Sequence, residues 1–181
     1  VVFGAAGSYG TATQIVANTA GGVSYAPGTG DAGFATFAAK LTGGSGFLAL
    51  PASDSSTNIN FTTTLAAAPN LSIVGDGDMT YTGTVTPNAT AYNWGGTSGK
   101  LTLGANAGTG ARNVNYTNGG TVAVNGAPDY TGTTSINGVV MVSIQNQITA
   151  RTNVSSVIPG TPLAAQNISL PSTLEVTSVA N

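Results

Sequence analysis

The stretch that decides the fold is DYTGTTSINGVVMVSI, residues 129–144, in which turn-forming residues give way abruptly to an apolar run. Gly132 and Gly138 stand where we expect the backbone to bend, because glycine adopts the conformations that tight turns need. In a strand, successive side chains point to opposite faces, so alternate residues of the apolar run share one face. The stretch therefore predicts a corner that leads into a strand of a buried sheet. The residues expected to face the core are Ile136, Val140, Val142 and Ile144.

Similar alternating runs recur along the chain, each bounded by Gly, Asn, Asp or Pro, as is typical of strands. The runs around Leu101, Val122 and Val140 are spaced by roughly twenty residues, which is within the range of solenoid repeats. We therefore predict an all-β fold, a parallel β-helix (β-solenoid), with one domain over residues 1–181. The predicted strands lie in FLALPA (47–52), LSIVGDG (71–77), GKLTLGAN (99–106), GTVAVNG (120–126), VVMVSI (139–144) and ISLPSTLEV (168–176).

One segment has the periodicity of a helix. In GDAGFATFAAKL, residues 30–41, four apolar residues share a face and Asp31 is placed to cap the first turn. A helix ahead of the first strand covers the end of the core, which a solenoid must protect. We expect residues 1–28 to form an extended segment, 29–45 a capping helix and turn, and 46–181 the β coils. The shared helical face consists of Phe34, Phe37, Ala38 and Leu41.

Two copies of one motif carry a resemblance to a known family. GDMTYTGT at 77–84 aligns without a gap with GAPDYTGT at 126–133 through the shared Gly and Tyr-Thr-Gly-Thr. The longer stretch at 120–142 resembles the autotransporter-associated β-strand repeat, in which Tyr-Thr-Gly, Thr, Ile-Asn and Gly precede an apolar strand. The first copy has Pro87 and Asn88 in place of the Ile-Asn-Gly half. The matching positions in the second copy are Tyr130, Thr131, Gly132, Thr134, Ile136, Asn137 and Gly138.

Residues 29–77 resemble a related group, the amino-terminal part of pectin-lyase-like right-handed β-helices. The shared order is a short helix, a Gly-rich turn, a strand ending in Pro and a later GDG turn. Together the resemblances imply a right-handed β-helix, secreted or exposed on a bacterial cell surface, often as part of a longer passenger. The autotransporter repeat implies a scaffold without chemistry of its own.

The amino-acid composition excludes several classes of binding partner and of catalytic site. Charged residues make up 6% of the chain and the net charge is −2, so the few cations cannot neutralise a phosphate backbone and we expect no nucleic-acid partner. The absence of His and Cys excludes a His-based triad, a His metal site and any disulfide. No apolar run reaches the length of about 18 residues of a transmembrane helix. We expect an extracellular or cell-surface protein without a cofactor.

Asp76 and Asp78 are the only acidic residues close together in sequence. Two carboxylates two apart in a strand share a face, where they can shift each other's pKa or hold a hard cation. The alternative is that GDGD forms a turn, since Asp and Gly are common where the backbone bends.

Tyr92 and Trp94 are also two residues apart, so on an extended backbone their rings face the same way. This arrangement is a candidate ligand-binding platform for stacking on sugar rings. The alternative is that both rings are large hydrophobic residues that cover a coil or loop.

Val139 and Met141 are the surplus apolar residues of the run at 139–144, on the face opposite to the predicted core. One interpretation is a lateral contact between subunits, because an exposed apolar strip usually marks an interface. The other is that residues 155–166 of the same chain cover them.

Three functions remain open on these observations. The first is a non-enzymatic structural subunit of an extracellular or cell-surface assembly, a fibre or passenger segment, which self-associates into a homopolymer through the open ends of its sheets. The second is a carbohydrate-binding or adhesive module using Tyr92 and Trp94. The third is a polysaccharide lyase or hydrolase using Asp76, Asp78 and Arg112. An alternative fold is a pilin-like β-sandwich completed by a donated strand, for which residues 1–17 are the candidate.

Overall fold

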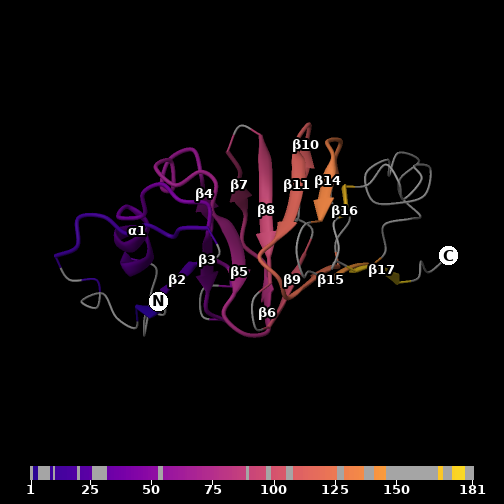
Figure 1. The fold of residues 1–181 in the computed structure, drawn as a ribbon, viewed down its shortest axis with the longest axis horizontal. Coiled ribbons are helices and arrows are strands. Elements are labelled where there is room, and N and C mark those ends of the chain that lie inside the picture. Colours follow the sequence, from indigo (N-terminus) through magenta and orange to yellow (C-terminus); the bar gives the residue numbers. More distant parts are fainter. Residues whose placement is uncertain are drawn as a thin grey trace.

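A computed structural model of the chain describes residues 2–3, 9, 11–19, 21–25, 32–52, 55–88, 90–96, 99–104, 108–125, 129–136, 141–145, 167–168 and 173–177. Residues 2, 32–33, 129, 141–145, 167–168 and 173–177 are described by their backbone alone. Within these ranges every strand pair is parallel, and the chain returns to the same sheet in coil after coil (Figure 1). The fold is the predicted all-β parallel β-helix, with very little helix.

The strands form two long sheets and a shorter third face. In spatial order, the first sheet consists of β1 (Val2–Phe3), β2 (Gly22–Tyr25), β3 (Phe47–Leu50), β5 (Ser72–Gly75), β8 (Ala91–Gly95), β11 (Asn113–Thr117), β14 (Thr134–Ile136) and β16 (Asn167–Ile168). The second sheet consists of β6 (Met79–Tyr81), β9 (Lys100–Leu103), β12 (Thr121–Val124), β15 (Met141–Gln145) and β17 (Thr173–Thr177). The third face carries two separate pairs, β4 (Ile59–Asn60) with β7 (Val85–Thr86) and β10 (Thr109–Gly110) with β13 (Asp129–Tyr130).

The core consists of side chains stacked in register from coil to coil. Because parallel strands pair residue by residue, an inward position in one coil lies beside an inward position in the next. Burying each of these side chains contributes about 1.5–3 kcal/mol, so the columns stabilise neighbouring coils together. On the first sheet one column contains Val23, Leu48, Ile73, Trp94, Tyr116 and Ile136, each at most 4% exposed. On the second sheet Met79, Leu101 and Val122 form one buried column, and Tyr81, Leu103 and Val124 form another.

The stretch at 129–144 takes the predicted form where it is described. Ile136 is 1% exposed, as expected of a core residue. The backbone register places Val142 beside Val122 and Ile144 beside Val124, so β15 extends the second sheet in register. Residues 137–140 lie outside the described residues. The run at 168–176, predicted as one strand, contains parts of β16 and β17, with Pro171 in the interval between them.

The predicted helix is present as α1 (Ala32–Ala38) and ends earlier than expected, before Leu41. Phe34, Phe37 and Ala38 on its apolar face are buried, and Leu41, which follows the helix, is buried as well. The aromatic cluster at this end includes Tyr25 stacked on Phe37, with ring centroids 4.9 Å apart. The expected order of elements was wrong in one respect, because α1 does not precede the first strand. Strands β1 and β2 come earlier in the chain and extend the first sheet beyond β3 (Figure 1). Residues 1–28 are therefore not simply an extended segment.

The alternative β-sandwich fold is not what the chain adopts. Val2–Phe3, which is part of the segment 1–17 considered for donation, pairs in parallel with β2 of its own chain. Phe3 also packs against Phe37, with ring centroids 5.5 Å apart. The amino-terminal strand is thus part of this chain's own first sheet.

The two Tyr-Thr-Gly-Thr copies form the same corner at different places in the coil. Tyr81 ends β6 in the second sheet, whereas Tyr130 ends β13 on the third face. In both copies the Gly backbone lies so close to the preceding coil that an added Cβ would be 2.4 Å from the Thr57 carbonyl oxygen at Gly83, and 2.2 Å from the Arg112 carbonyl oxygen at Gly132.

The Thr that follows each Gly completes this corner. The Thr84 amide donates to the Asn58 side-chain oxygen over 2.9 Å, and the Thr133 amide donates to that of Asn113 over 3.0 Å. Each Asn belongs to the preceding coil. The motif is therefore a coil-to-coil corner in which the Gly allows close approach and an Asn of the neighbouring coil binds the next amide.

Candidate functional site

Tyr92 and Trp94 lie on β8, and both rings point into the core. Trp94 is 1% exposed and Tyr92 is 4% exposed; the two rings stack at 6.3 Å, and Trp94 also contacts Tyr81 at 6.1 Å. Asn93, between them, faces outward and accepts a hydrogen bond from the Asn115 side chain of the next coil. The predicted sugar-stacking platform is therefore not formed, because both rings are covered by their own chain.

Asp76 and Asp78 lie in the bend between β5 and β6, not in a strand. Asp76 accepts a hydrogen bond from the Ser24 hydroxyl over 2.8 Å, and Asp78 accepts one from the Lys100 amide over 2.7 Å. Gly77 between them has φ of +90°, a conformation that glycine adopts readily. Each carboxylate thus holds together neighbouring parts of the solenoid. Among the described residues, no three His, Cys, Asp or Glu side chains gather as a metal site would require.

Arg112 lies at a different corner from the two carboxylates. It follows β10 on the third face and precedes β11 of the first sheet, whereas Asp76 and Asp78 follow β5 of the first sheet and precede β6 of the second. The three residues proposed for a lyase or hydrolase are thus not brought to one corner of the coil.

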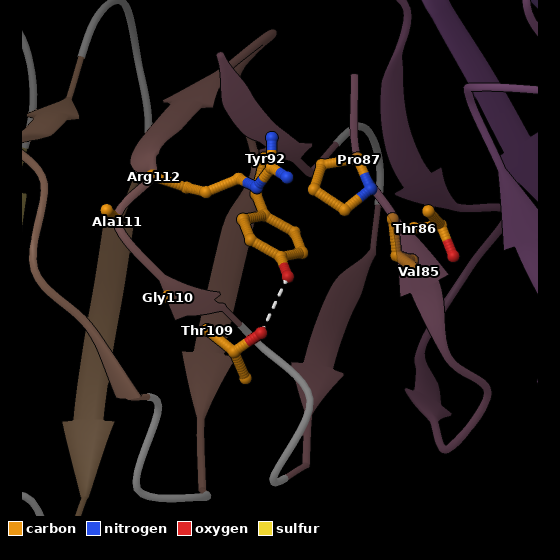
Figure 2. A pocket seen from close by; sticks show the side chains of 8 residues that line it. All are labelled: Val85, Thr86, Pro87, Tyr92, Thr109, Gly110, Ala111 and Arg112. Atoms are coloured by element: carbon orange, nitrogen blue, oxygen red, sulfur yellow. Dashed lines mark hydrogen bonds between the residues drawn. The ribbon is translucent and has the colours of Figure 1, made fainter. Parts of the chain in front are cut away.

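The third face contains a lateral pocket of about 520 Å³ between β7 and β10. Figure 2 shows Tyr92 between the segment from Thr109 to Arg112 on one side and that from Val85 to Pro87 on the other. The Tyr92 hydroxyl is 3.0 Å from the Thr109 hydroxyl, and the Arg112 Nη1 donates to the Asn88 carbonyl oxygen over 2.7 Å. The pocket lining consists of Val85, Thr86, Pro87, Tyr92, Thr109, Gly110, Ala111 and Arg112.

Interrupted pairing of the third face accounts for the position of the lateral pocket. In the part of the chain that the structure describes, β7 pairs with β4 alone and β10 with β13 alone, so no ladder joins β7 to β10. Pro87 follows β7 directly and has no amide hydrogen, so it cannot donate to a ladder at this point. Sequence reasoning singled out Tyr92 and Arg112 but not their proximity, for which Pro87 is the only local signal.

The buried tyrosines are structural rather than acid–base groups at neutral pH. Burial raises the pKa of the Tyr81 hydroxyl, which donates to the Thr57 carbonyl oxygen over 2.7 Å. Burial, followed by the charge of nearby Tyr130, raises the pKa of Tyr116 well above its ordinary value. Both phenols therefore stay protonated in the folded state across the physiological range.

Val139 lies outside the described residues, and Met141 is described by its backbone alone, where it pairs with Thr121. The subunit interface predicted at these two residues stays a prediction. Among the described residues whose exposure is known, Val16 is the only large apolar residue that is exposed, at 48%.

The described part of the chain contains no helix long and apolar enough to span a membrane. Neither protein families, nor characterised proteins, nor solved structures show a significant match to the chain.

Proposed function

We propose that this chain is a non-enzymatic structural element of an extracellular or cell-surface assembly, a fibre subunit or a passenger segment. The observation that carries the proposal is the pair of long parallel sheets with continuous core columns, which makes each coil a rigid platform for the next. A stack of this kind has open backbone groups at its end strands, and another chain can pair with them. Among the described residues, β1 is the terminal strand of the first sheet.

The chemistry of the described residues favours a scaffold over an enzyme. The acidic residues considered for catalysis bind backbone and hydroxyl groups of neighbouring coils, and Arg112 is at another corner. The aromatic pair considered for glycan binding contributes to the core instead. These positions support a role in which side chains hold coils together.

We further propose membership of the autotransporter-associated repeat group or of the pectin-lyase-like β-helices. The shared corner of the two Tyr-Thr-Gly-Thr copies supports this assignment, because an unrelated sequence match has no reason to reproduce the same carbonyl contact and the same Asn-to-Thr bond. A charge-poor surface without Cys agrees with a secreted or bacterial cell-surface location.

Assembly of the purified chain tests the structural role. We expect electron microscopy to show filaments, and Val2→Lys to shorten or abolish them, because a charge on an edge strand opposes pairing with another chain. Thr63→Lys, which adds the same charge at an exposed turn position, is the matched control and should leave filaments intact. A chain that sediments as a monomer at millimolar concentration would contradict the proposal.

A further inference from the structure

The lateral pocket combines one cation with several hydroxyl groups. Among the described residues, the Arg112 guanidinium has the Asn88 carbonyl oxygen as its partner and no carboxylate. A guanidinium carries five N–H donors in a planar fork, so this single bond orients the group and leaves donors for a ligand. The hydroxyls of Thr86, Thr109 and Tyr92 are the other polar side-chain groups of the lining.

The shape of the lateral pocket follows from the same interruption of the third face. Its base is Tyr92, which is held by its bond to Thr109, and Pro87, which is buried. Thr86 and Thr109 are exposed on opposite walls, and Arg112 is half-buried at one end (Figure 2). Within the described residues, β7 and β10 each pair on one side only, so no ladder bonds join these two strands across the pocket. The pocket therefore offers donors and acceptors around one positive charge.

We propose that the lateral pocket binds a hydroxycarboxylate of monosaccharide size, with its carboxylate on Arg112 and its hydroxyls between Thr86 and Thr109. A carboxylate accepts two parallel N–H bonds from a guanidinium, which is the strongest pairing that this lining offers. The volume of about 520 Å³ lies within the range of about 300–1,000 Å³ that small-molecule sites occupy. This binding is independent of the proposed structural role, since it uses the side of the solenoid and not its ends.

Three small probes separate the contributions of charge and hydroxyls. Gluconate carries both, sorbitol has the hydroxyls without the charge, and acetate has the charge without the hydroxyls. In calorimetric or NMR titrations of the purified chain we expect gluconate to bind at least about tenfold more tightly than either partial probe. Glucuronate, compared with gluconate, distinguishes an acidic sugar unit of a glycan from a free hydroxy acid, since both share the proposed chemistry.

Variants assign the binding to the lateral pocket. Arg112→Gln should weaken gluconate binding at least about tenfold, and Arg112→Lys should weaken it less, because it keeps the charge but loses the fork. Thr109→Val, which keeps Arg112, should weaken it by about threefold. Lys100→Gln removes the same charge from exposed Lys100 on the second sheet and should change it less than about twofold. Thermal unfolding of each variant checks that it is folded.

Three results would overturn the proposal. One is equal affinity of folded Arg112→Gln and the parent chain for gluconate. Another is an equal loss in Lys100→Gln, which would mean that overall charge is responsible. The third is sorbitol binding as tightly as gluconate, which would show that the charge of Arg112 does not contribute to binding.

Discussion

Gly132→Ala tests the corner that joins successive coils. An alanine Cβ at this position would be 2.2 Å from the Arg112 carbonyl oxygen, a separation that real Cβ atoms essentially never show. The φ of Gly132 is not among the positive values, so alanine is acceptable to its backbone conformation and the contact alone opposes it. The obstacle is backbone, which cannot rotate away as a flexible side chain would, so the two coils must separate locally.

The expected loss of stability follows from two contributions. Overpacking of a tight site costs about 1–3 kcal/mol. Separation also lengthens the bond from the Gly132 amide to the Arg112 carbonyl oxygen and that from the Thr133 amide to the Asn113 side chain, each of which contributes about 1 kcal/mol. We expect a loss of about 3–5 kcal/mol in the free energy of unfolding. For a domain of this size the midpoint of thermal unfolding then falls by about 10 °C.

The chain contains its own probe for this measurement. Trp94 is the only tryptophan and is 1% exposed, so its fluorescence reports exposure of the core during urea unfolding. Gly83→Ala, whose Cβ would be 2.4 Å from the Thr57 carbonyl oxygen, should cost a similar amount. Gly110→Ala is the matched control, because Gly110 has φ of +71° but open space around its Cβ position, and it should cost only about 1 kcal/mol. A loss in Gly132→Ala no larger than in Gly110→Ala would refute the crowding argument.

Three further predictions concern the core, the pH dependence and one turn. Trp94→Ala should lower the free energy of unfolding by about 3–5 kcal/mol, measured by urea unfolding followed by circular dichroism, because it leaves a cavity in the first-sheet column. A loss below about 1 kcal/mol would contradict the burial of this ring. The pKa values of Tyr81 and Tyr116 are raised in the folded state, so their contribution to stability is fully present below pH 10, the unfolded pKa, and is lost as the pH rises above it. Above pH 10 the free energy of unfolding should therefore fall by about 1.4 kcal/mol per pH unit for each tyrosine. Tyr116→Phe should remove the share of that slope that Tyr116 contributes. Asn88→Ala should cost about 2–3 kcal/mol, because the Asn88 side-chain oxygen accepts hydrogen bonds from the Thr90 amide, the Thr90 hydroxyl and the Ala91 amide. The control Asn125→Ala, at an exposed position, should cost less than about 0.5 kcal/mol. Equal losses in the two variants would show that the Asn88 turn contributes nothing specific.

The strands that sequence patterning predicted are those whose inward residues are aliphatic. Val122 and Val124 of β12, for example, alternate with smaller or polar residues, so a period of two is plain. The strands β8 and β11 were not among the predicted ones, although Trp94 and Tyr116 are core residues there. Their sequences, AYNWG and NVNYT, carry aromatic groups and outward Asn side chains, which disguise the alternation. The sequence analysis also did not predict β1 and β2, which precede the helix and pair with the first sheet.

The lateral pocket could not be predicted from the sequence, for a different reason. Its walls come from residues 85–87 and 109–112, which meet only because of the register between successive coils. Register depends on the length of every intervening corner, and a difference of one residue would turn inward positions outward. Asp76 and Asp78 illustrate the converse. They are only two residues apart in sequence, but the bend at Gly77 gives each carboxylate a separate partner.

The two Tyr-Thr-Gly-Thr copies show what a repeat motif in this solenoid specifies. After Tyr81 the chain passes along the third face before it returns to the first sheet, whereas after Tyr130 it enters the first sheet directly. What both copies share is local, namely a Gly against a carbonyl of the preceding coil and an Asn that binds the next Thr amide. An alignment that superposes the motif therefore matches corners and not faces. The face on which a corner lies is set by the core columns, because a wrong register would expose Leu101 and Val122 together.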